Sequence, residues 1–226
     1  MHLPNHHIFV PAGNYVALSL KQANLAVLAN VLLIILNGSV LAEERPSVRS
    51  LMEVRKQNIV IQNWDLSCGA AALATILNYQ HGESVSEREV ATRMMSREEY
   101  LANPMLVRLR QGFSLLDMKR FVDDRGYNGI GLGQMTLAHL IERAPVIVPI
   151  NAYGYQHFVV FRGVLDNRVL LADPAFGNRT MQLSDFKSAW IEFTEIGRVG
   201  FVVVRKDGLI PPNLLAPNPG EFVTLN

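Results

Sequence analysis

The residue of this chain best suited to chemistry is its single cysteine, Cys68, in the stretch QNWDLSCGAAALATILNY at positions 62–79. Ser67 precedes it and is a residue type favoured at helix N-caps. The alanines and leucines that follow are strong helix formers, so we expect Cys68 in the first turn of a buried helix. The unpaired N–H groups and positive dipole end of that turn favour a thiolate over a thiol. Cys68 is therefore a candidate nucleophile.

A cysteine nucleophile also needs a base and a group that orients the base. His157 opens the strand-like run HFVVFRGV, and Asp173 closes a second strand-like run, RVLLADP. Gln62, upstream of Cys68, carries an amide that could donate a hydrogen bond to an oxyanion, with the Cys68 backbone N–H as second donor. These four residues predict thiolate attack on a carbonyl, with His157 as base and Asp173 as its orienting group.

His157 and Asp173 can act together only if both point to the same face of a hairpin. Because side chains alternate with period two, a two-residue loop would pair Asp173 with Val160, on the face opposite His157. An odd-numbered loop or a bulge corrects the register. A three-residue loop ending at Asn167 would pair Asp173 with Val159, on the side of His157, and Asn167 tolerates the left-handed conformation that such a loop needs.

Each of these residues also has an ordinary structural explanation. A lone cysteine beside alanines is often a small buried hydrophobe, a single histidine is often satisfied by a backbone carbonyl, and an Asp-Pro pair often starts a turn. Gln62 could lie at the surface. The polar turn at 63–67 favours the chemical interpretation of Cys68, because it places the cysteine at the start of the helix and near solvent.

The other histidines offer no second site. We expect His81, in a turn, and His139, in a short predicted helix, to be solvated. One cysteine and scattered histidines lack the spacing of metal ligands, so neither a metal nor another cofactor is expected.

The sequence resembles the double-glycine peptidases, papain-like cysteine proteases known from bacteriocin exporters. The resemblance covers about residues 59–204 and lies in Gln62 with Cys68-Gly69, in His157-Phe158-Val159-Val160, and in Asp173-Pro174-Ala175 with Gly177. It implies a cysteine endopeptidase that cleaves after small residues, such as a Gly-Gly pair, in proteins or peptides of a secretion system. It also implies the papain-like fold.

Two departures narrow the resemblance. The separation between Cys68 and His157 is shorter than in papain itself, so only the compact double-glycine branch fits. The sequence also lacks the transporter modules of bacteriocin exporters, so we expect a peptidase acting alone or beside a separate secretion apparatus. Within the family the chain looks most like the stand-alone exported peptidases encoded with bacterial functional-amyloid secretion systems.

Helical patterns precede strand-like runs along the chain, which predicts an α+β domain whose N-terminal helical half faces an antiparallel sheet, with the site between them. The expected helix N-caps after the Cys68 helix are Ser86, Ser114, Thr136 and Ser184. The helix from Ser86 is expected to continue to about Tyr100. The strand-like runs are NIVIQNW, VIVPI, HFVVFRGV, RVLLADP and GFVVVRK.

An apolar stretch, ANLAVLANVLLIILNGSVLA, follows Lys21. Val40 and Ala42 fit the −3 and −1 positions of a signal-peptide cleavage site, so we expect cleavage after Ala42 and a periplasmic location. The alternative is an uncleaved membrane anchor, although the unbroken apolar part is short for a span of about 20 residues. In an exported protein, one cysteine that cannot pair within the chain indicates a free, functional thiol.

These patterns divide the chain into a leader at 1–42, a charged linker at 43–57, a peptidase domain at 58–207 and an extended, loosely held Pro-rich tail at 208–226. With 226 residues and 49% apolar composition, one sizeable core is expected. The net charge of +1, from 21 basic and 20 acidic side chains, argues against nucleic-acid binding. Membrane contact is expected only through an uncleaved leader.

The rival hypothesis is a non-catalytic papain-like module that binds an extended peptide of a secretion substrate. Degenerate relatives of this kind usually lose the cysteine or the histidine. This chain keeps Cys68, His157, Asp173 and Gln62, which favours the enzyme.

Overall fold

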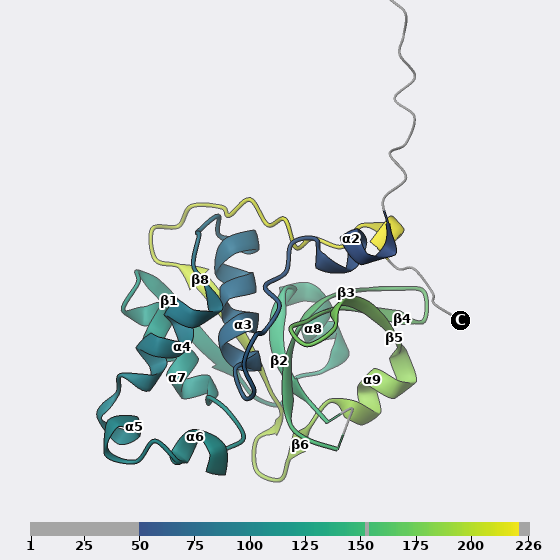
Figure 1. Cartoon of the computed structure of the whole chain (residues 1–226). Coiled ribbons are helices and arrows are strands. Elements are labelled where there is room, and N and C mark those ends of the chain that lie inside the picture. The colour runs from purple at the N-terminus through teal and green to yellow at the C-terminus, as the bar shows by residue number, and fades with distance from the viewer. Residues whose placement is uncertain (1–49, 152–153, 222–226) are drawn as a thin grey trace, which may run out of the picture. The chain divides into compact units, whose positions relative to one another are not determined.

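The computed structural model describes residues 50–151 and 154–221 (Figure 1). Its helices are α2 (Leu51–Lys56), α3 (Cys68–Thr75) with a π-helical extension η1 (Ile76–Gln80), α4 (Glu87–Met95), α5 (Glu98–Ala102), α6 (Leu106–Leu109), α7 (Leu115–Asp123), α8 (Leu137–Arg143), α9 (Leu183–Ala189) and the 3-10 turn η2 (Pro219–Glu221). Its strands are β1 (Tyr127–Leu132), β2 (Val146–Ile150), β3 (His157–Leu165), β4 (Arg168–Asp173), β5 (Gly177–Gln182), β6 (Glu192–Phe193), β7 (Gly197–Arg198) and β8 (Gly200–Arg205).

Six strands form one antiparallel sheet in the order β1-β8-β2-β3-β4-β5, and β6 pairs with β7 in a small separate ribbon. Figure 1 shows α3 in the middle, with β2 and β3 on one side and α4 and α7 on the other, and α7 also packs against β1 of the sheet. The predicted α+β architecture, with a helical half facing an antiparallel sheet, is confirmed.

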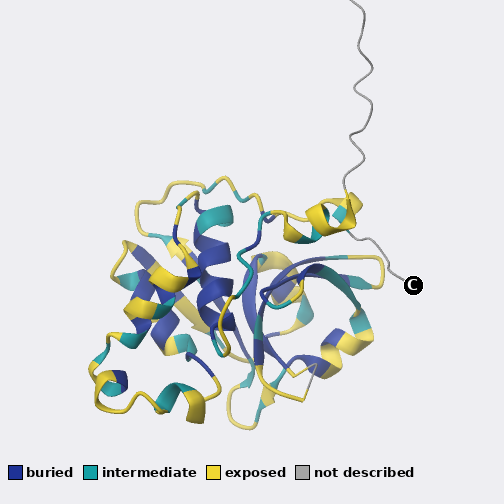
Figure 2. Ribbon diagram, in the orientation of Figure 1, coloured by how far each residue is buried: buried dark blue, intermediate teal, exposed yellow. Residues whose placement is uncertain are grey.

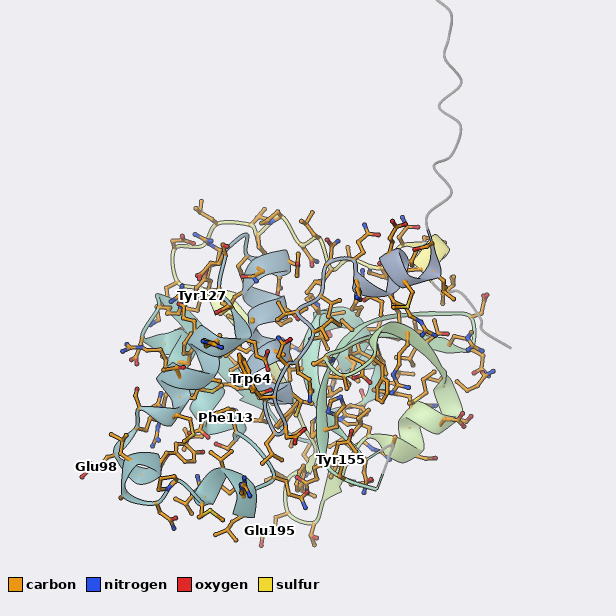
Figure 3. The ribbon with its side chains drawn as sticks, viewed as in Figure 1. Trp64, Glu98, Phe113, Tyr127, Tyr155 and Glu195 are labelled. Atoms are coloured by element: carbon orange, nitrogen blue, oxygen red, sulfur yellow. The ribbon has the colours of Figure 1, made fainter. Side chains whose placement is uncertain are left out.

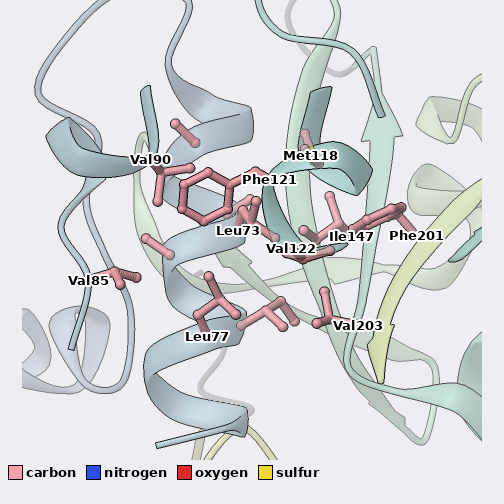
Figure 4. Packing of buried hydrophobic residues seen from close by; sticks show 14 of the residues in the cluster. Leu73, Leu77, Val85, Val90, Met118, Phe121, Val122, Ile147, Phe201 and Val203 are labelled. Carbon is pink, nitrogen blue, oxygen red and sulfur yellow. The ribbon is translucent and has the colours of Figure 1, made fainter. Parts of the chain in front are cut away.

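The central strands are buried on both faces, which explains why their sequences are continuous apolar runs instead of alternating ones. Val160 of β3 packs into the cluster shared with α3, α4 and α7, whereas Val159 and Phe161 pack into a second cluster with α8 and α9. Figure 4 shows the first cluster, in which Leu73 of α3 packs with Val122 of α7. The sheet is thus held from both sides.

Helix α3 is buried along its whole length, as Figure 2 shows, because its alanines and leucine present no polar side chain to either neighbour. The predicted N-caps Ser86, Ser114 and Thr136 each accept a hydrogen bond from the backbone N–H three residues on, which begins α4, α7 and α8. Ser184 does not cap; α9 begins at Leu183, and its N-cap residue is Gln182.

The helix predicted from Ser86 to Tyr100 is two helices. Ser96 ends α4 because its hydroxyl donates to the carbonyl of Arg93 at 2.8 Å, and Arg97 is extended before α5 begins.

Other departures from the sequence expectations lie at the edges of the domain. The run NIVIQNW is not a strand, while β1 and β5 form where no strand was expected. The end of the predicted linker forms α2, capped by Ser50. Within the described part of the tail, residues 208–221, Leu215 is fully buried, so this part is anchored to the domain there. The signal-peptide prediction lies outside the described residues. No helix in the part of the chain that the structure describes is long and apolar enough to cross a membrane.

Candidate active site

Cys68 is the first residue of α3, as predicted, and only 6% of its surface is exposed. The first backbone bond of the helix runs from the N–H of Ala71 to the carbonyl of Ser67, so the N–H groups of the first turn lie outside the helical ladder. Ser67 occupies the N-cap position, but its side chain makes no capping hydrogen bond to the helix, so the prediction that Ser67 caps α3 is wrong in this respect. Its hydroxyl lies instead within hydrogen-bond distance of two acceptors, the carbonyl of Trp64, at 2.6 Å, and the buried carboxylate of Glu87, and its single hydrogen bonds one of them at a time.

Gly69 lets α3 approach the sheet closely. A Cβ at this position would lie 2.6 Å from Cε of Met118 and 3.4 Å from the ring of Phe158. Cε of Met118 is the end of a flexible side chain on α7, so a side chain at this position would displace Met118, whereas the ring of Phe158 lies at ordinary contact distance. The glycine after the cysteine therefore leaves room for Met118 beside the start of α3.

His157 and Asp173 form the predicted pair. Nε2 of His157 lies 2.7 Å from Oδ1 of Asp173, and both side chains are almost completely buried. The hairpin has the two-residue loop, not the three-residue one, and its register is corrected by a bulge: Phe161 pairs with Leu171, but Gly163 pairs with Leu170. Asp173 consequently lies on the same face as His157.

The pKa of His157 is raised. Burial by itself lowers it, but hydrogen bonds to Asp173 and to the Cys68 side chain, with the charges of both groups, outweigh burial and raise it to about 9. Since Asp173 occupies Nε2, Nδ1 is the ring nitrogen left for proton exchange with Cys68. The structure therefore brings the side chains of Cys68, His157 and Asp173 together.

Asp173 has further donors that the sequence did not indicate. Its Oδ1 also accepts from the N–H of Ala175 at 3.0 Å, and its Oδ2 accepts from Nε of Arg179 at 2.8 Å. Arg179 lies on β5, whose sequence GNRTMQ lacks a β-type apolar run, so no local signal pointed to it. Strand β5 begins at Gly177, whose φ of +84° is a conformation that favours glycine. A Cβ at this position would also clash with the carbonyl of Arg55.

Gln62 is anchored beside the Asp173 turn. Its N–H donates to the carbonyl of Pro174 at 2.9 Å. Its side-chain Nε2 makes only a long contact, 3.4 Å, to the carbonyl of Trp64, and its Oε1 is buried without a hydrogen-bond partner among the described residues. Such an amide is available to a ligand, but no contact joins it to Cys68.

A cavity of about 230 Å³ opens beside the pair. His157 and Phe158 line it, together with the apolar residues Phe113, Leu115, Pro149, Phe193 and Val199. Tyr155, which Figure 3 labels with Trp64, packs edge-on against the ring of His157 with 5.9 Å between ring centroids. The site is therefore a buried pair beside a largely apolar cavity.

The other two histidines in the described part of the chain, His81 and His139, do not join the site. His81 is buried, contrary to expectation, with Nε2 3.2 Å from the carbonyl of Val203, and burial lowers its pKa. His139 is exposed, as predicted. The described residues include no group of three or more histidine, cysteine or acidic side chains that could hold a metal ion.

Comparison with known proteins gives a family match. The model of the peptidase C39 family matches residues 56–195. Two curated relatives are each named probable functional amyloid protease FapD: that of Pseudomonas aeruginosa is 40% identical over 154 residues, which are 67% of this chain and 66% of the relative. That of Pseudomonas fluorescens is also 40% identical, over 66% of this chain and 65% of its own. The match thus spans just under two thirds of these relatives.

Two solved structures share the fold. A double glycine motif protease from an AMS/PCAT transporter, in complex with the leader peptide, has a TM-score of 0.51 and 21% identity over 65% of this chain and 90% of its own. The peptidase domain of Streptococcus ComA, a bifunctional ABC transporter involved in quorum sensing, has a TM-score of 0.51 and 18% identity over 65% and 97%. The predicted papain-like peptidase fold is confirmed.

Proposed function

The chain belongs to the peptidase C39 family, and on this premise we propose that it is a cysteine endopeptidase acting on proteins of a secretion system. One observation carries the proposal: the buried pair of His157 and Asp173, 2.7 Å apart, is hydrogen-bonded to the thiol at the start of α3. A histidine fixed by a carboxylate beside a cysteine is the general arrangement of an activated nucleophile.

In the first step, Nδ1 of His157 takes the proton of Cys68. The thiolate sulfur attacks the carbonyl carbon of the scissile peptide, so an S–C bond forms and the carbonyl electrons move onto oxygen. Asp173 keeps the ring in place and stabilises the imidazolium. Because the hydrogen on Nε2 is bound to Asp173, Nδ1 is the nitrogen that takes the proton from Cys68 and holds it beside the reacting atoms.

The negative oxygen needs donors. We assign this role to the N–H of Cys68, at the free end of α3, and to the side-chain amide of Gln62, whose backbone is anchored to Pro174. The His157 imidazolium then gives its proton to the leaving amine as the C–N bond breaks. Water, deprotonated by His157, attacks the thioester and releases the acid.

The substrate proposal comes from the relatives. Their names describe a functional amyloid protease and a double glycine motif protease bound to a leader peptide. The apolar groove beside His157 fits an extended peptide whose residues before the cleavage point include apolar ones. Cleavage after small residues such as Gly-Gly, in proteins exported with this one, is the proposed specificity, and the periplasm is the proposed location.

The rival function is a module that binds such a peptide without cleaving it. A fluorogenic peptide with a Gly-Gly site separates the two functions. We expect turnover that iodoacetamide abolishes, and no turnover of a matched peptide with Val-Val at the site. Peptide binding without turnover, in fresh reduced protein, would support the binding module.

A further inference from the structure

Glu87 is the first residue of α4. Among the described residues, its carboxylate accepts side-chain hydrogen bonds only from the segment between Gln62 and Cys68. Its two oxygens accept from the N–H of Asn63, at 3.0 and 2.9 Å, and Oε2 accepts from the Asn63 amide at 2.9 Å. Oε1 also accepts from the hydroxyl of Ser67. Glu87 is 2% exposed, and no lysine or arginine in the described part of the chain forms an ion pair with it.

The segment that Glu87 holds is strained. Leu66 has φ of +65°, a left-handed conformation that leucine rarely adopts. Such backbone persists only where its surroundings hold it. Here the guanidinium of Arg88 also covers the ring of Trp64, at 5.2 Å, and a Cβ on Gly112 would lie 3.0 Å from the carbonyl of Leu66. Neighbours thus surround the turn. The Ser67 hydroxyl also reaches the carbonyl of Trp64 within it, and Glu87 joins Asn63 at one end to Ser67 at the other.

Those two ends carry the oxyanion donors. Asn63 directly follows Gln62, and Ser67 directly precedes Cys68, so one carboxylate fixes the neighbours of both proposed donors at once. Gln62 is independently anchored to the turn after Asp173, and Cys68 is fixed by the buried helix α3. Glu87 adds a hydrogen-bonded link between the residue after Gln62 and the residue before Cys68.

We propose that Glu87 is a positioning residue for oxyanion stabilisation. It touches neither substrate nor the sulfur, and it acts by holding the turn from Asn63 to Ser67 so that the two donors converge on one point. This inference rests on the proposed peptidase function. A carboxylate suits the role because every group that faces it is a donor, whereas a glutamine would turn its NH₂ group against one of them.

The test compares two reactions of Cys68 that need no peptide groove. Acetyl transfer from p-nitrophenyl acetate forms the S–C bond and breaks the C–O bond to p-nitrophenolate through a tetrahedral oxyanion. Alkylation by iodoacetamide displaces iodide from a saturated carbon and forms no oxyanion. The ratio of acylation rate to alkylation rate therefore measures oxyanion stabilisation separately from the reactivity of the thiolate.

For Glu87→Gln we expect the acylation rate to fall at least about tenfold, with alkylation within about twofold of wild type, because a displacement near 1 Å is enough for such a loss. The matched control is Glu89→Gln on the same helix, whose exposed carboxylate contacts Arg125, and which should change neither rate. If Glu87→Gln does not fold, Ser67→Ala, which removes one of the hydrogen bonds, should lower the same ratio to a smaller extent.

An unchanged ratio in a folded variant, or equal losses in both rates, would overturn the role of Glu87. Wild-type protein that hydrolyses no peptide would instead refute the proposed function, and the ratio would still decide the role of Glu87. The two failures are therefore distinguishable in the same set of samples.

Discussion

His157 and Asp173 meet across β3 and β4 because Arg162 is bulged out of the ladder between them. Without that one-residue shift, a two-residue hairpin loop would leave the two side chains on opposite faces. With it, Nε2 and Oδ1 lie 2.7 Å apart. The stability of the bulge and the geometry of the pair are thus linked, and the predictions below test the pair and its supports.

Replacing Cys68 with alanine should abolish peptide cleavage with little effect on folding. Alanine is the best helix former and fills the first turn of α3 as well as cysteine does. We expect no measurable turnover and a midpoint of thermal unfolding within a few degrees of wild type. Retained turnover would show that the nucleophile is another group.

Replacing His157 with alanine should slow alkylation of Cys68 by iodoacetamide at pH 6 at least about tenfold. The imidazolium, whose pKa is raised to about 9, is the positive charge that stabilises the thiolate, and its loss leaves only the N-terminus of α3. Equal rates in wild type and variant would show that Cys68 and His157 are not paired.

Replacing Asp173 with alanine should lower the rate of peptide turnover more than the rate of alkylation of Cys68, because the carboxylate mainly orients the ring.

The same raised pKa predicts how stability changes with pH. Because the folded-state pKa of His157 lies above 6.5, its protonation stabilises the folded state fully below pH 6.5, and this contribution is lost as pH rises through about 9. The difference in free energy of unfolding between wild type and His157→Gln should therefore shrink, by on the order of 1–3 kcal/mol, between pH 6 and pH 10. Urea unfolding at the two pH values measures it, and a constant difference would contradict the raised pKa.

Replacing Arg179 with methionine should lower kcat about tenfold, because Asp173 loses the guanidinium that accompanies its buried carboxylate. We also expect a loss of about 1–3 kcal/mol in free energy of unfolding. Arg179→Lys should restore part of both. The control is Arg168→Met, since Arg168 on the adjacent strand bonds the hydroxyl of Thr180. Wild-type kcat in Arg179→Met would mean that Ala175 and His157 suffice to hold Asp173.

Replacing Glu221 with glutamine should destabilise the bulge. Glu221 of the tail binds the buried guanidinium of Arg162 through both oxygens, at 2.8 and 3.0 Å. We expect a loss of about 1–3 kcal/mol in free energy of unfolding and a severalfold lower kcat at unchanged KM. Glu192→Gln, which weakens only an exposed pair with Arg198, is the control. A loss of stability without any loss of kcat would uncouple the tail from the catalytic register.

Mature protein should begin near Glu43, because the predicted cleavage follows Ala42. N-terminal sequencing of the protein recovered from the periplasm tests this. A sequence that starts before Asn37 would favour the uncleaved anchor.

The sequence by itself determined the parts of the site that depend on local chemistry. The run of alanines and leucines after Ser67 forms a buried helix wherever it packs, so Cys68 had to lie at a helix start. The caps Ser114 and Thr136 act within one helical turn, and the apolar runs at His157 and Val169 form strands because both of their faces are buried. The candidate nucleophile, base and carboxylate could therefore be proposed from the chain.

Tertiary structure decided the register and the supports. A bulge depends on the pairing of two strands and on the residues that pack against it. Here Nε of the buried, bulged Arg162 donates a hydrogen bond to the carbonyl of Leu215 in the tail, 53 residues away. Arg179 became a partner of Asp173 only because β5 joins the edge of the sheet, a pairing that its own residues do not favour. Glu87 likewise serves the turn before Cys68 only after α4 packs on α3. Contacts of this kind are selected by the packing of distant elements, and no local pattern encodes them.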